Sequence, residues 1–258
     1  MGSQRKGRFM KLAYLKNYWD KYHEKMQLTI NPLLNPSILI SGESGSGKSH
    51  ALKWMIRNLL ESQEVDLYFC NFKDSLDFRF LQSYSKYYVG KGCEQGFQAF
   101  YDRFCEIQTQ EGEAIPYMTL LIFDEFPAFM LRTQNEDKKK ADRYSRMLAD
   151  VLMFFRSYKG GCWIVCQRSD SQYFANGSRD NFHGKILLTR GRPSKESLNM
   201  LGFVKEDLQA DTYGVGEGIC YIDGKGLFEI KYPFYDAAKI ETEILKLLAR
   251  PPSGKPEA

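Results

Sequence analysis

Residues 37–50 read Ser-Ile-Leu-Ile-Ser-Gly-Glu-Ser-Gly-Ser-Gly-Lys-Ser-His, and this stretch decides the fold. Its apolar start has the length of a strand, and apolar residues recur every three or four positions after Ser49, as in a helix. Between them, Gly42 to Ser49 match the phosphate-loop pattern G-x-x-x-x-G-K-[ST] in the strand–turn–helix context that the motif requires. The glycines let backbone N–H groups turn toward phosphate oxygens, and the positive end of the helix faces the same anion. The stretch therefore predicts a site for a nucleoside triphosphate.

Individual loop residues have predictable roles. We expect Lys48 to reach the β- and γ-phosphates and the Ser49 hydroxyl to bind Mg²⁺. The bland alternative is a chance glycine-rich turn, but both flanks of the loop fit the motif. The predicted nucleotide-binding residues are Gly42, Glu43, Ser44, Gly45, Ser46, Gly47, Lys48, Ser49 and His50.

Composition limits the function classes. With 258 residues, of which 43% are hydrophobic, the chain suits one α/β domain with small appendages. No apolar run has the length of a membrane span and the start lacks a signal-peptide pattern, so we expect a cytoplasmic protein. Attachment to the inner face of the cell membrane would need a partner or a segment outside this sequence. A net charge of +4 permits a polyanionic partner without requiring one. The six scattered cysteines favour free thiols over a zinc site.

Three segments are expected along the chain. Residues 1–34 form an N-terminal helical extension, because apolar and aromatic positions between 9 and 26 suggest a helix. Residues 35–250 form the nucleotide-binding domain, and residues 251–258 a disordered tail.

Strands and helices alternate through the middle segment. Strands are expected at 65–71, 117–124, 162–166 and 185–188, and helices near 94–107, 138–159, 194–201 and 235–248. Asp223-Gly224 lies between two further strand-like runs and signals a hairpin turn. This order predicts an α/β fold with a mostly parallel central sheet, helices on both faces and a C-terminal antiparallel hairpin at the sheet edge.

Asp124 and Glu125 follow the most apolar strand, where a Walker-B acid pair belongs. We expect Asp124 to hold Mg²⁺ and Glu125 to polarise the water that attacks the γ-phosphate. The alternative is an ordinary polar strand end. Because many nucleotide kinases and small GTPases lack the second acid, Glu125 favours hydrolysis.

Gln167 and Arg156 are further catalytic candidates. Gln167 follows a strand, so its amide should emerge at the sheet edge that carries Lys48 and Asp124, where it could contact the γ-phosphate. Otherwise it is a solvated loop residue. Arg156, in the last helical turn, either favours the helix C-terminus electrostatically or acts across a subunit boundary as an arginine finger. Other arginines compete for that role: Arg143, Arg146, Arg168, Arg190 and Arg192.

Three segments together resemble the motor domain of FtsK/SpoIIIE-type DNA translocases and the coupling ATPases of conjugative elements. They are Gly-Glu-Ser-Gly-Ser-Gly-Lys-Ser, Ile-Phe-Asp-Glu-Phe, and Phe-Arg-Ser-Tyr-Lys-Gly-Gly-Cys-Trp-Ile-Val-Cys-Gln-Arg-Ser. The spacing of eleven positions between Arg156 and Gln167 matches the family. Asn71-Phe72-Lys73 is also similar to the family's Asp-Pro-Lys, with the acid and the proline replaced.

The resemblance implies a RecA-like P-loop NTPase that uses ATP and Mg²⁺, assembles as a homohexameric ring and pumps double-stranded DNA in conjugative transfer or chromosome segregation. It also implies relaxase or membrane-anchored transfer-machinery partners. Two readings compete with it. One is a nucleotide-gated coupling or docking protein, and the other is a different ring ATPase, such as a packaging motor or helicase loader. The chain differs from chromosome translocases in having no recognisable winged-helix module or membrane span.

For DNA contact, the predicted segment is a loop over residues 132–143 that contains Lys138, Lys139 and Lys140. Lysines on phosphates bind without sequence preference and weaken with salt. The alternative is a solvated helix start, since Glu136 and Asp137 precede the lysines.

Overall fold

Strand β3 (Ile38–Gly42) lies inside a ten-stranded sheet. The computed structural model describes residues 9–109, 116–169 and 173–250. On one side of the sheet the strands run parallel to β3, as the sequence predicts. In sheet order these strands are β8 (Gly184–Leu188), β3, β7 (Gly160–Cys166), β6 (Met118–Asp124), β4 (Val65–Asn71) and β5 (Tyr87–Val89).

The other side of the sheet is antiparallel and contains more than the predicted hairpin. Beyond β8 come β9 (Glu217–Ile222), β10 (Gly226–Lys231), β1 (Met10–Leu15) and β2 (Gln27–Ile30). The hairpin β9–β10 is confirmed, but it is not the edge of the sheet, because β1 and β2 lie outside it.

The prediction of a helix over residues 9–26 is wrong in its extent. Only α1 (Lys16–Tyr22) is helical there. At the start of β1, Met10 and Leu12 are buried and Lys11 is exposed, which is the period of a strand, and a register shift between Lys11 and Ala13 places Ala13 in the core as well. Pairing of Tyr14 with Lys231 then stabilises the strand. The boundaries after residues 34 and 250 stay predictions, and the predicted tail over residues 251–258 lies outside the described residues.

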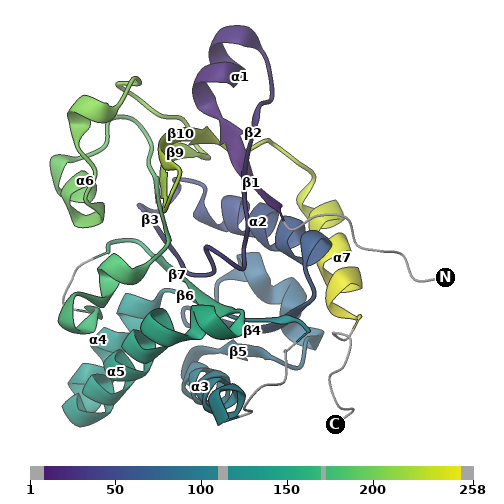
Figure 1. Ribbon diagram of the computed structural model, residues 1–258, viewed down its shortest axis with the longest axis vertical. Helices are drawn as coiled ribbons and strands as arrows, with labels where there is room; N and C mark the ends of the chain where they lie inside the picture. Colours follow the sequence, from purple (N-terminus) through teal and green to yellow (C-terminus); the bar gives the residue numbers. More distant parts are fainter. Residues whose placement is uncertain (1–8, 110–115, 170–172, 251–258) are drawn as a thin grey trace.

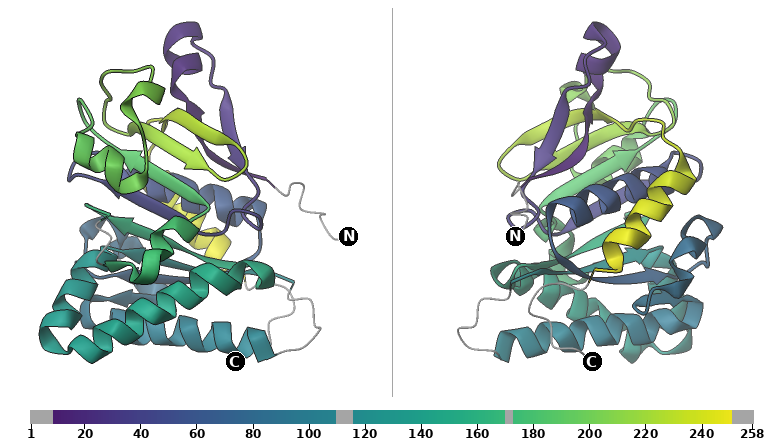
Figure 2. Two further views of the ribbon diagram at one scale, coloured as in Figure 1. Left: turned by 60° about the vertical axis from the view of Figure 1, so that its left-hand side comes forward. Right: turned by 90° about the vertical axis from the view of Figure 1, so that its right-hand side faces the viewer.

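Helices cover both faces of the sheet. On one face, α2 (Lys48–Ser62) and α7 (Ala237–Leu248) lie side by side (Figure 2, right). The opposite face is covered by α3 (Cys93–Thr109), α4 (Phe126–Glu136) and α5 (Lys138–Phe154) (Figure 1). Alternate residues of β3 face the two layers: Ile38 and Ile40 pack in the α2–α7 core, and Leu39 packs in the other. Burial on both faces explains the uniformly apolar central strands.

The segment after β6 differs from the prediction of a loop over residues 132–143. Helix α4 continues to Glu136, and α5 begins at Lys138. Asp137 separates them, because its carboxylate accepts a hydrogen bond from the Lys140 N–H at 3.2 Å and caps α5. Helix α5 also ends earlier than predicted, at Phe154, and a 3₁₀ turn over Phe155–Tyr158 follows.

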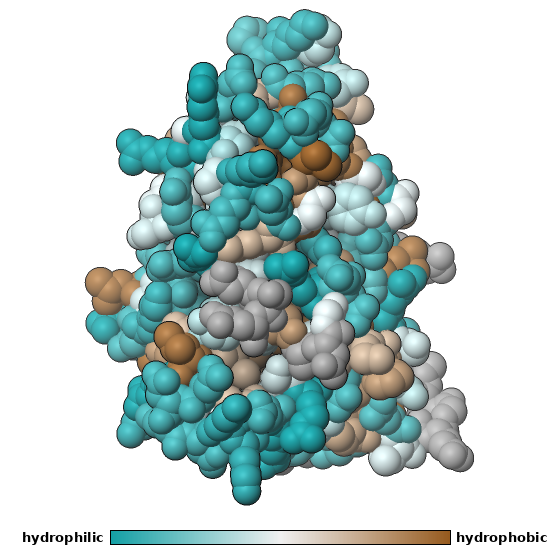
Figure 3. All heavy atoms as spheres, turned by 90° about the vertical axis from the view of Figure 1, so that its left-hand side faces the viewer, coloured by the Kyte–Doolittle hydropathy of each residue, from teal (hydrophilic) through white to brown (hydrophobic). Residues whose placement is uncertain are grey.

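The shorter helix α6 (Lys195–Leu201) begins as predicted, with Ser194 as its N-cap. On the side of the molecule that Figure 3 presents, the surface is mainly hydrophilic, with small separate apolar patches. Within the described ranges, no helix combines the length and the apolar character that a membrane crossing needs.

Candidate nucleotide-binding site

The phosphate loop adopts a backbone that glycine makes possible. Gly45 and Gly47 have φ angles of 78° and 96°, in the left-handed region. A Cβ on Gly47 would also lie 2.8 Å from the Gly216 nitrogen. The same neighbour holds the loop from outside, since the Gly216 N–H donates to the Ser46 carbonyl at 2.9 Å. The segment before β9 thus fixes the loop to the antiparallel part of the sheet.

Lys48 begins α2 and points across the loop. Its ammonium group donates to the carbonyl oxygens of Gly42 and Glu43, the latter at 2.9 Å. Burial lowers the pKa of Lys48, and the nearby carboxylates of Glu125 and Asp124 oppose that shift. The two carbonyl contacts place the ammonium group at the loop, where a polyphosphate would replace the carbonyls as its partner.

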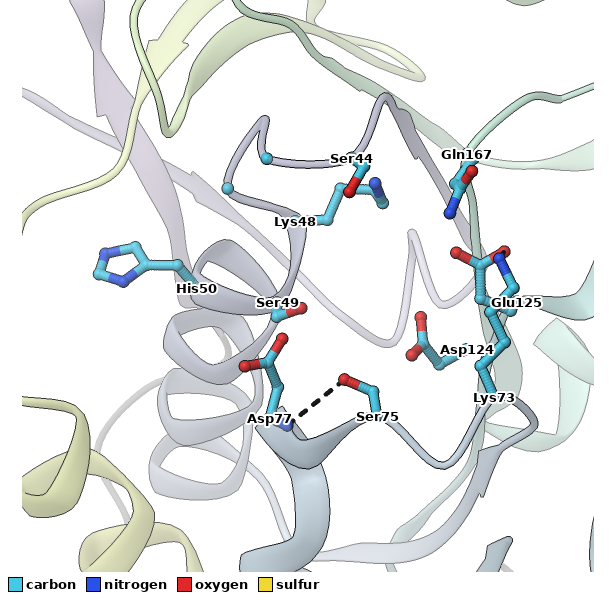
Figure 4. A pocket seen from close by; sticks show the side chains of 12 residues that line it. Ser44, Lys48, Ser49, His50, Lys73, Ser75, Asp77, Asp124, Glu125 and Gln167 are labelled. Atoms are coloured by element: carbon cyan, nitrogen blue, oxygen red, sulfur yellow. Dashed lines mark hydrogen bonds and ion pairs between the residues drawn. The ribbon is translucent and has the colours of Figure 1, made fainter. Parts of the chain in front are cut away.

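Strand register explains why distant residues meet at this site. Ser41 pairs with Cys166 across β3 and β7, and Asp124 pairs with Val165 across β7 and β6. All three strands are parallel, so Gln167 and the residues that follow β3 and β6 emerge at one edge. The predicted convergence of Gln167 with Lys48 and Asp124 agrees with their common pocket (Figure 4).

That pocket has a volume of about 430 Å³. Six of its twelve lining residues were predicted to bind nucleotide, three were predicted as metal or catalytic residues, and three were not predicted. Its lining residues are Ser44, Gly45, Gly47, Lys48, Ser49, His50, Lys73, Ser75, Asp77, Asp124, Glu125 and Gln167. Of the predicted loop residues, Gly42, Glu43 and Ser46 lie outside this lining, and Glu43 instead accepts a hydrogen bond from the Arg190 N–H at 3.1 Å.

Asp124 is suited to hold a divalent cation. Only 8% of the residue is exposed, and burial, followed by the charge of Glu125, raises its pKa to about 7. The carboxylate points into the pocket from one side and the Ser49 hydroxyl lies on the other (Figure 4). Carboxylate and hydroxyl oxygens are ligands that Mg²⁺ accepts. The residues present therefore fit the metal that accompanies nucleoside triphosphates.

Glu125 has an unusual backbone. Its φ and ψ are 64° and 42°, in the left-handed region that a glutamate rarely occupies. The conformation is held by its N–H, which donates to the Val165 carbonyl at 2.9 Å, and by α4, which starts at the next residue. Such conformations cost free energy and cluster at functional sites. The turn lets the Glu125 carboxylate line the same pocket as Asp124.

Lys73 is a site residue to which the sequence reasoning gave no role. It follows β4, and Asn71 at the end of that strand pairs with Asp124. The Lys73 ammonium lies 3.0 Å from Glu125 Oε2. Ser75 and Asp77 complete this wall, where the Ser75 hydroxyl accepts a hydrogen bond from the Asp77 N–H at 3.3 Å. The available signal was the similarity of Asn71-Phe72-Lys73 to the Asp-Pro-Lys segment of the family that the sequence resembles.

Arg156 lies away from this pocket. It is exposed on the 3₁₀ turn that precedes the first residue of β7, whereas Gln167 follows the last. The two residues therefore occupy opposite edges of the sheet. Met153 and Phe154, beside Arg156, are 59% and 49% exposed. Burial lowers the pKa of His183, and the positive charge of Arg156 lowers it further.

The lysines considered for DNA contact start α5. Lys138 and Lys139 are exposed, whereas Lys140 forms an ion pair with Glu94. Three of the arginines that compete with Arg156 have partners of their own. Arg143 donates to Gln98, Arg146 to the Asp142 carbonyl, and Arg168 to Glu196.

Comparison with solved structures identifies the fold. The pCW3 conjugation coupling protein TcpA, in its monomer form with ATPγS, superimposes with a TM-score of 0.67 and 23% identity over 86% of this chain and 67% of TcpA. The chain has a RecA-like P-loop ATPase fold. Neither a protein-family model nor a curated protein sequence matches it.

Two further structures share this ATPase fold. The cytoplasmic domain of the Thermomonospora curvata type VII secretion ATPase EccC gives a TM-score of 0.67 at 15% identity, covering 98% of this chain and 32% of EccC. VirB4 of Thermoanaerobacter pseudethanolicus gives a TM-score of 0.56 at 11% identity, covering 88% of this chain and 96% of VirB4. The chain thus spans about a third of the EccC cytoplasmic domain.

Proposed function

We propose that the protein is an ATP-hydrolysing motor subunit. The observation that carries the proposal is the convergence of Lys48, Asp124, Glu125 and Gln167 on one pocket at the carboxyl edge of a parallel sheet. A phosphate loop alone would support nucleotide binding. Glu125, the second acid of the pair, supports hydrolysis, because a carboxylate can accept a proton from the attacking water.

The pocket divides the work among its residues. The phosphate loop binds the triphosphate, and Lys48 neutralises its β- and γ-phosphates. Ser49 and Asp124 would hold Mg²⁺, which supplies positive charge to the phosphate oxygens. Glu125 orients and deprotonates the attacking water, and the Gln167 amide contacts the γ-phosphate or that water.

Arg156 would act on the nucleotide of a second copy. Within one chain it lies at the sheet edge opposite the phosphate loop, so it lines no part of its own pocket. Its exposure beside the apolar side chains of Met153 and Phe154 supports contact with a neighbouring subunit. An arginine supplied in this way stabilises charge in the transition state. This supports a ring of identical subunits, hexameric in our proposal.

Double-stranded DNA is the proposed cargo, moved in conjugative transfer or chromosome segregation. The similarity to a conjugation coupling protein supports this cargo, and so do the exposed Lys138 and Lys139. A relaxase or membrane-anchored transfer proteins would then be the partners of a cytoplasmic motor. Similarity to EccC, with the same TM-score, supports a second candidate in which the motor serves protein secretion.

The experiment that tests the proposal measures ATP hydrolysis with and without double-stranded DNA at several salt concentrations. We expect DNA to stimulate hydrolysis, and the stimulation to fall as salt rises, because phosphate contacts release counterions. Lys48→Ala is the control that should remove nucleotide binding. An ATP hydrolysis rate that DNA does not change at any salt concentration would favour the secretion candidate. A protein that does not hydrolyse ATP under any of these conditions would contradict the motor proposal.

A further inference from the structure

Phe234 is an exposed aromatic residue beside the nucleotide pocket. Its side chain is 88% exposed, although both flanking residues are partly or fully buried. Exposure of a whole phenylalanine ring forgoes the hydrophobic stabilisation that burial would give. The ring lies on the connection between β10 and α7, next to His50 of the phosphate-loop helix, with the two ring centres 6.3 Å apart.

The backbone that carries Phe234 is held tightly against the loop. The Pro233 carbonyl lies 2.7 Å from His50 Nε2, and the Tyr235 hydroxyl donates to the His50 carbonyl. The Tyr235 ring also stacks on His50, with centres 3.9 Å apart and an interplanar angle of 14°. On the other side, the Tyr232 N–H donates to the Gly216 carbonyl at 2.8 Å. Phe234 is therefore an exposed ring on a fixed support.

The arrangement of the pocket predicts which end of a bound triphosphate lies near Phe234. Asp124, Glu125 and Gln167 line one side of the pocket, and that side takes the γ-phosphate. His50 projects from the opposite side of the loop (Figure 4). A triphosphate bound along the loop would therefore have its nucleoside end next to His50, beside the exposed ring of Phe234.

A second apolar side chain borders the same side of the loop. Val215 is 48% exposed, and its Cγ1 lies 3.3 Å from where a Cβ on Gly47 would be. Its neighbour Gly216 bonds both Ser46 and Tyr232, so the Val215 and Phe234 segments are joined at the loop. Val215 and Phe234 are thus two exposed apolar side chains on connected segments, and together they suit contact with one face of a flat aromatic ligand.

We propose that Phe234 is the platform on which the base of the bound nucleotide stacks. The inference rests on the proposed function of the pocket and adds the group that recognises the nucleoside half of ATP. Aromatic rings bind bases through their π-faces, and this contact tolerates different bases. Phe234 supplies no hydrogen bond to the base, so its contribution is affinity for the nucleoside rather than selection of one base.

The test compares ATP with inorganic tripolyphosphate, which has the phosphates but no base, by calorimetry in the presence of Mg²⁺. We expect Phe234→Ala to weaken ATP binding about tenfold, the order of one stacked base, and to leave tripolyphosphate binding unchanged. Phe234→Tyr, which keeps the ring, should bind ATP like the unmodified protein.

Phe9→Ala is the matched control. Phe9 is 59% exposed and precedes β1. The carbonyl of Lys11, two positions further on, accepts a hydrogen bond from Asn58, which lies about two turns along α2 from His50. It should bind ATP normally.

Two results would contradict the stacking role of Phe234 without contradicting the proposed function of the pocket. Unchanged ATP affinity in Phe234→Ala would show that the ring serves another contact, such as one with a second copy. Equal losses for ATP and tripolyphosphate would show that it supports the loop rather than the base. An unmodified protein that binds neither ligand would overturn the proposed function, and the platform with it.

Discussion

Lys73 Nζ lies 3.0 Å from Glu125 Oε2, although the two residues follow different strands of the sheet. Adjacent parallel strands β4 and β6 bring them together, and Glu125 is nearly buried while Lys73 remains half-exposed. The lysine therefore holds in place the acid that would activate water.

Replacing Lys73 by methionine should slow hydrolysis while preserving ATP binding. The side chain keeps its length but loses the charge that orients Glu125, so we expect kcat to fall about tenfold or more. Steady-state kinetics with a separate binding measurement would check this. Lys246→Met, at an exposed position of α7, is the control. An unchanged kcat would mean that the ion pair has no part in the chemistry.

The left-handed backbone of Glu125 predicts an order of stability between two inactive variants. Glu125→Ala and Glu125→Gly both remove the carboxylate and its contact with Lys73. Only glycine adopts a φ of 64° without strain, so the glycine variant should be more stable by about 1 kcal/mol. Urea unfolding measures the difference. Equal stabilities would mean that the backbone relaxes freely at this turn.

A mixing experiment tests whether Arg156 acts between subunits. Arg156→Ala should hydrolyse ATP about 100-fold more slowly or worse, and Glu125→Gln should bind ATP without hydrolysing it. In a mixture, the Glu125→Gln subunit supplies an intact Arg156 to the intact pocket of its neighbour. We therefore expect partial recovery of hydrolysis.

Arg143→Ala serves as the comparison for that experiment, because Arg143 already donates to Gln98 at the surface. It should hydrolyse ATP normally. Normal hydrolysis by Arg156→Ala instead would remove the arginine finger from the proposal.

Glu217 predicts a pH-dependent stability. Burial acts to raise its pKa, but hydrogen bonds from the Gly214 N–H, Lys231 and Lys16 lower it overall. A lowered pKa stabilises the folded state above the unfolded pKa of about 4.3, and that contribution is lost as the pH falls through the folded value. Glu217→Gln should therefore cost about 2 kcal/mol near pH 7.

The loss should begin to shrink as the pH falls below about 4.3, and it should vanish only below the lowered folded pKa, where the native carboxyl is also protonated. Urea unfolding of both proteins at neutral and acidic pH provides the measurement. Glu196→Gln, whose exposed carboxylate pairs with Arg168 at the surface, should change stability little at either pH. A Glu217→Gln deficit that persists undiminished in acid would contradict the assignment.

The phosphate loop and its sheet edge could be predicted because local patterns specify them. Gly42 to Ser49 carry their own flanking strand and helix, and Asp124 and Gln167 each follow an apolar run. Once the strands are parallel, their carboxyl ends meet at one edge. Arg156 was predicted either to favour the helix C-terminus or to act across a subunit boundary, and its separation from the pocket became apparent only from the position of the turn before β7.

The rest depended on contacts between distant parts of the chain. Met10 to Leu15 form a strand because β10, more than 200 positions later, supplies the hydrogen-bonding partner. Lys73 matters only because β4 neighbours β6, and sheet order is not written in a local pattern. No role could be predicted for Phe234 from the sequence, because a single phenylalanine indicates no function until its exposure and its distance from His50 are known.

The N-terminal strand pair has a practical consequence for dissecting the protein. A recombinant fragment trimmed to begin at residue 35 would keep every motif yet lose β1, which pairs with β10, together with β2, the outer strand that pairs with β1. The freed backbone groups of that strand would invite another chain to pair with them, so the fragment should aggregate where the longer protein stays in solution. Expressed fragments should therefore start before Met10, so that they keep the complete sheet and not only the sequence motifs.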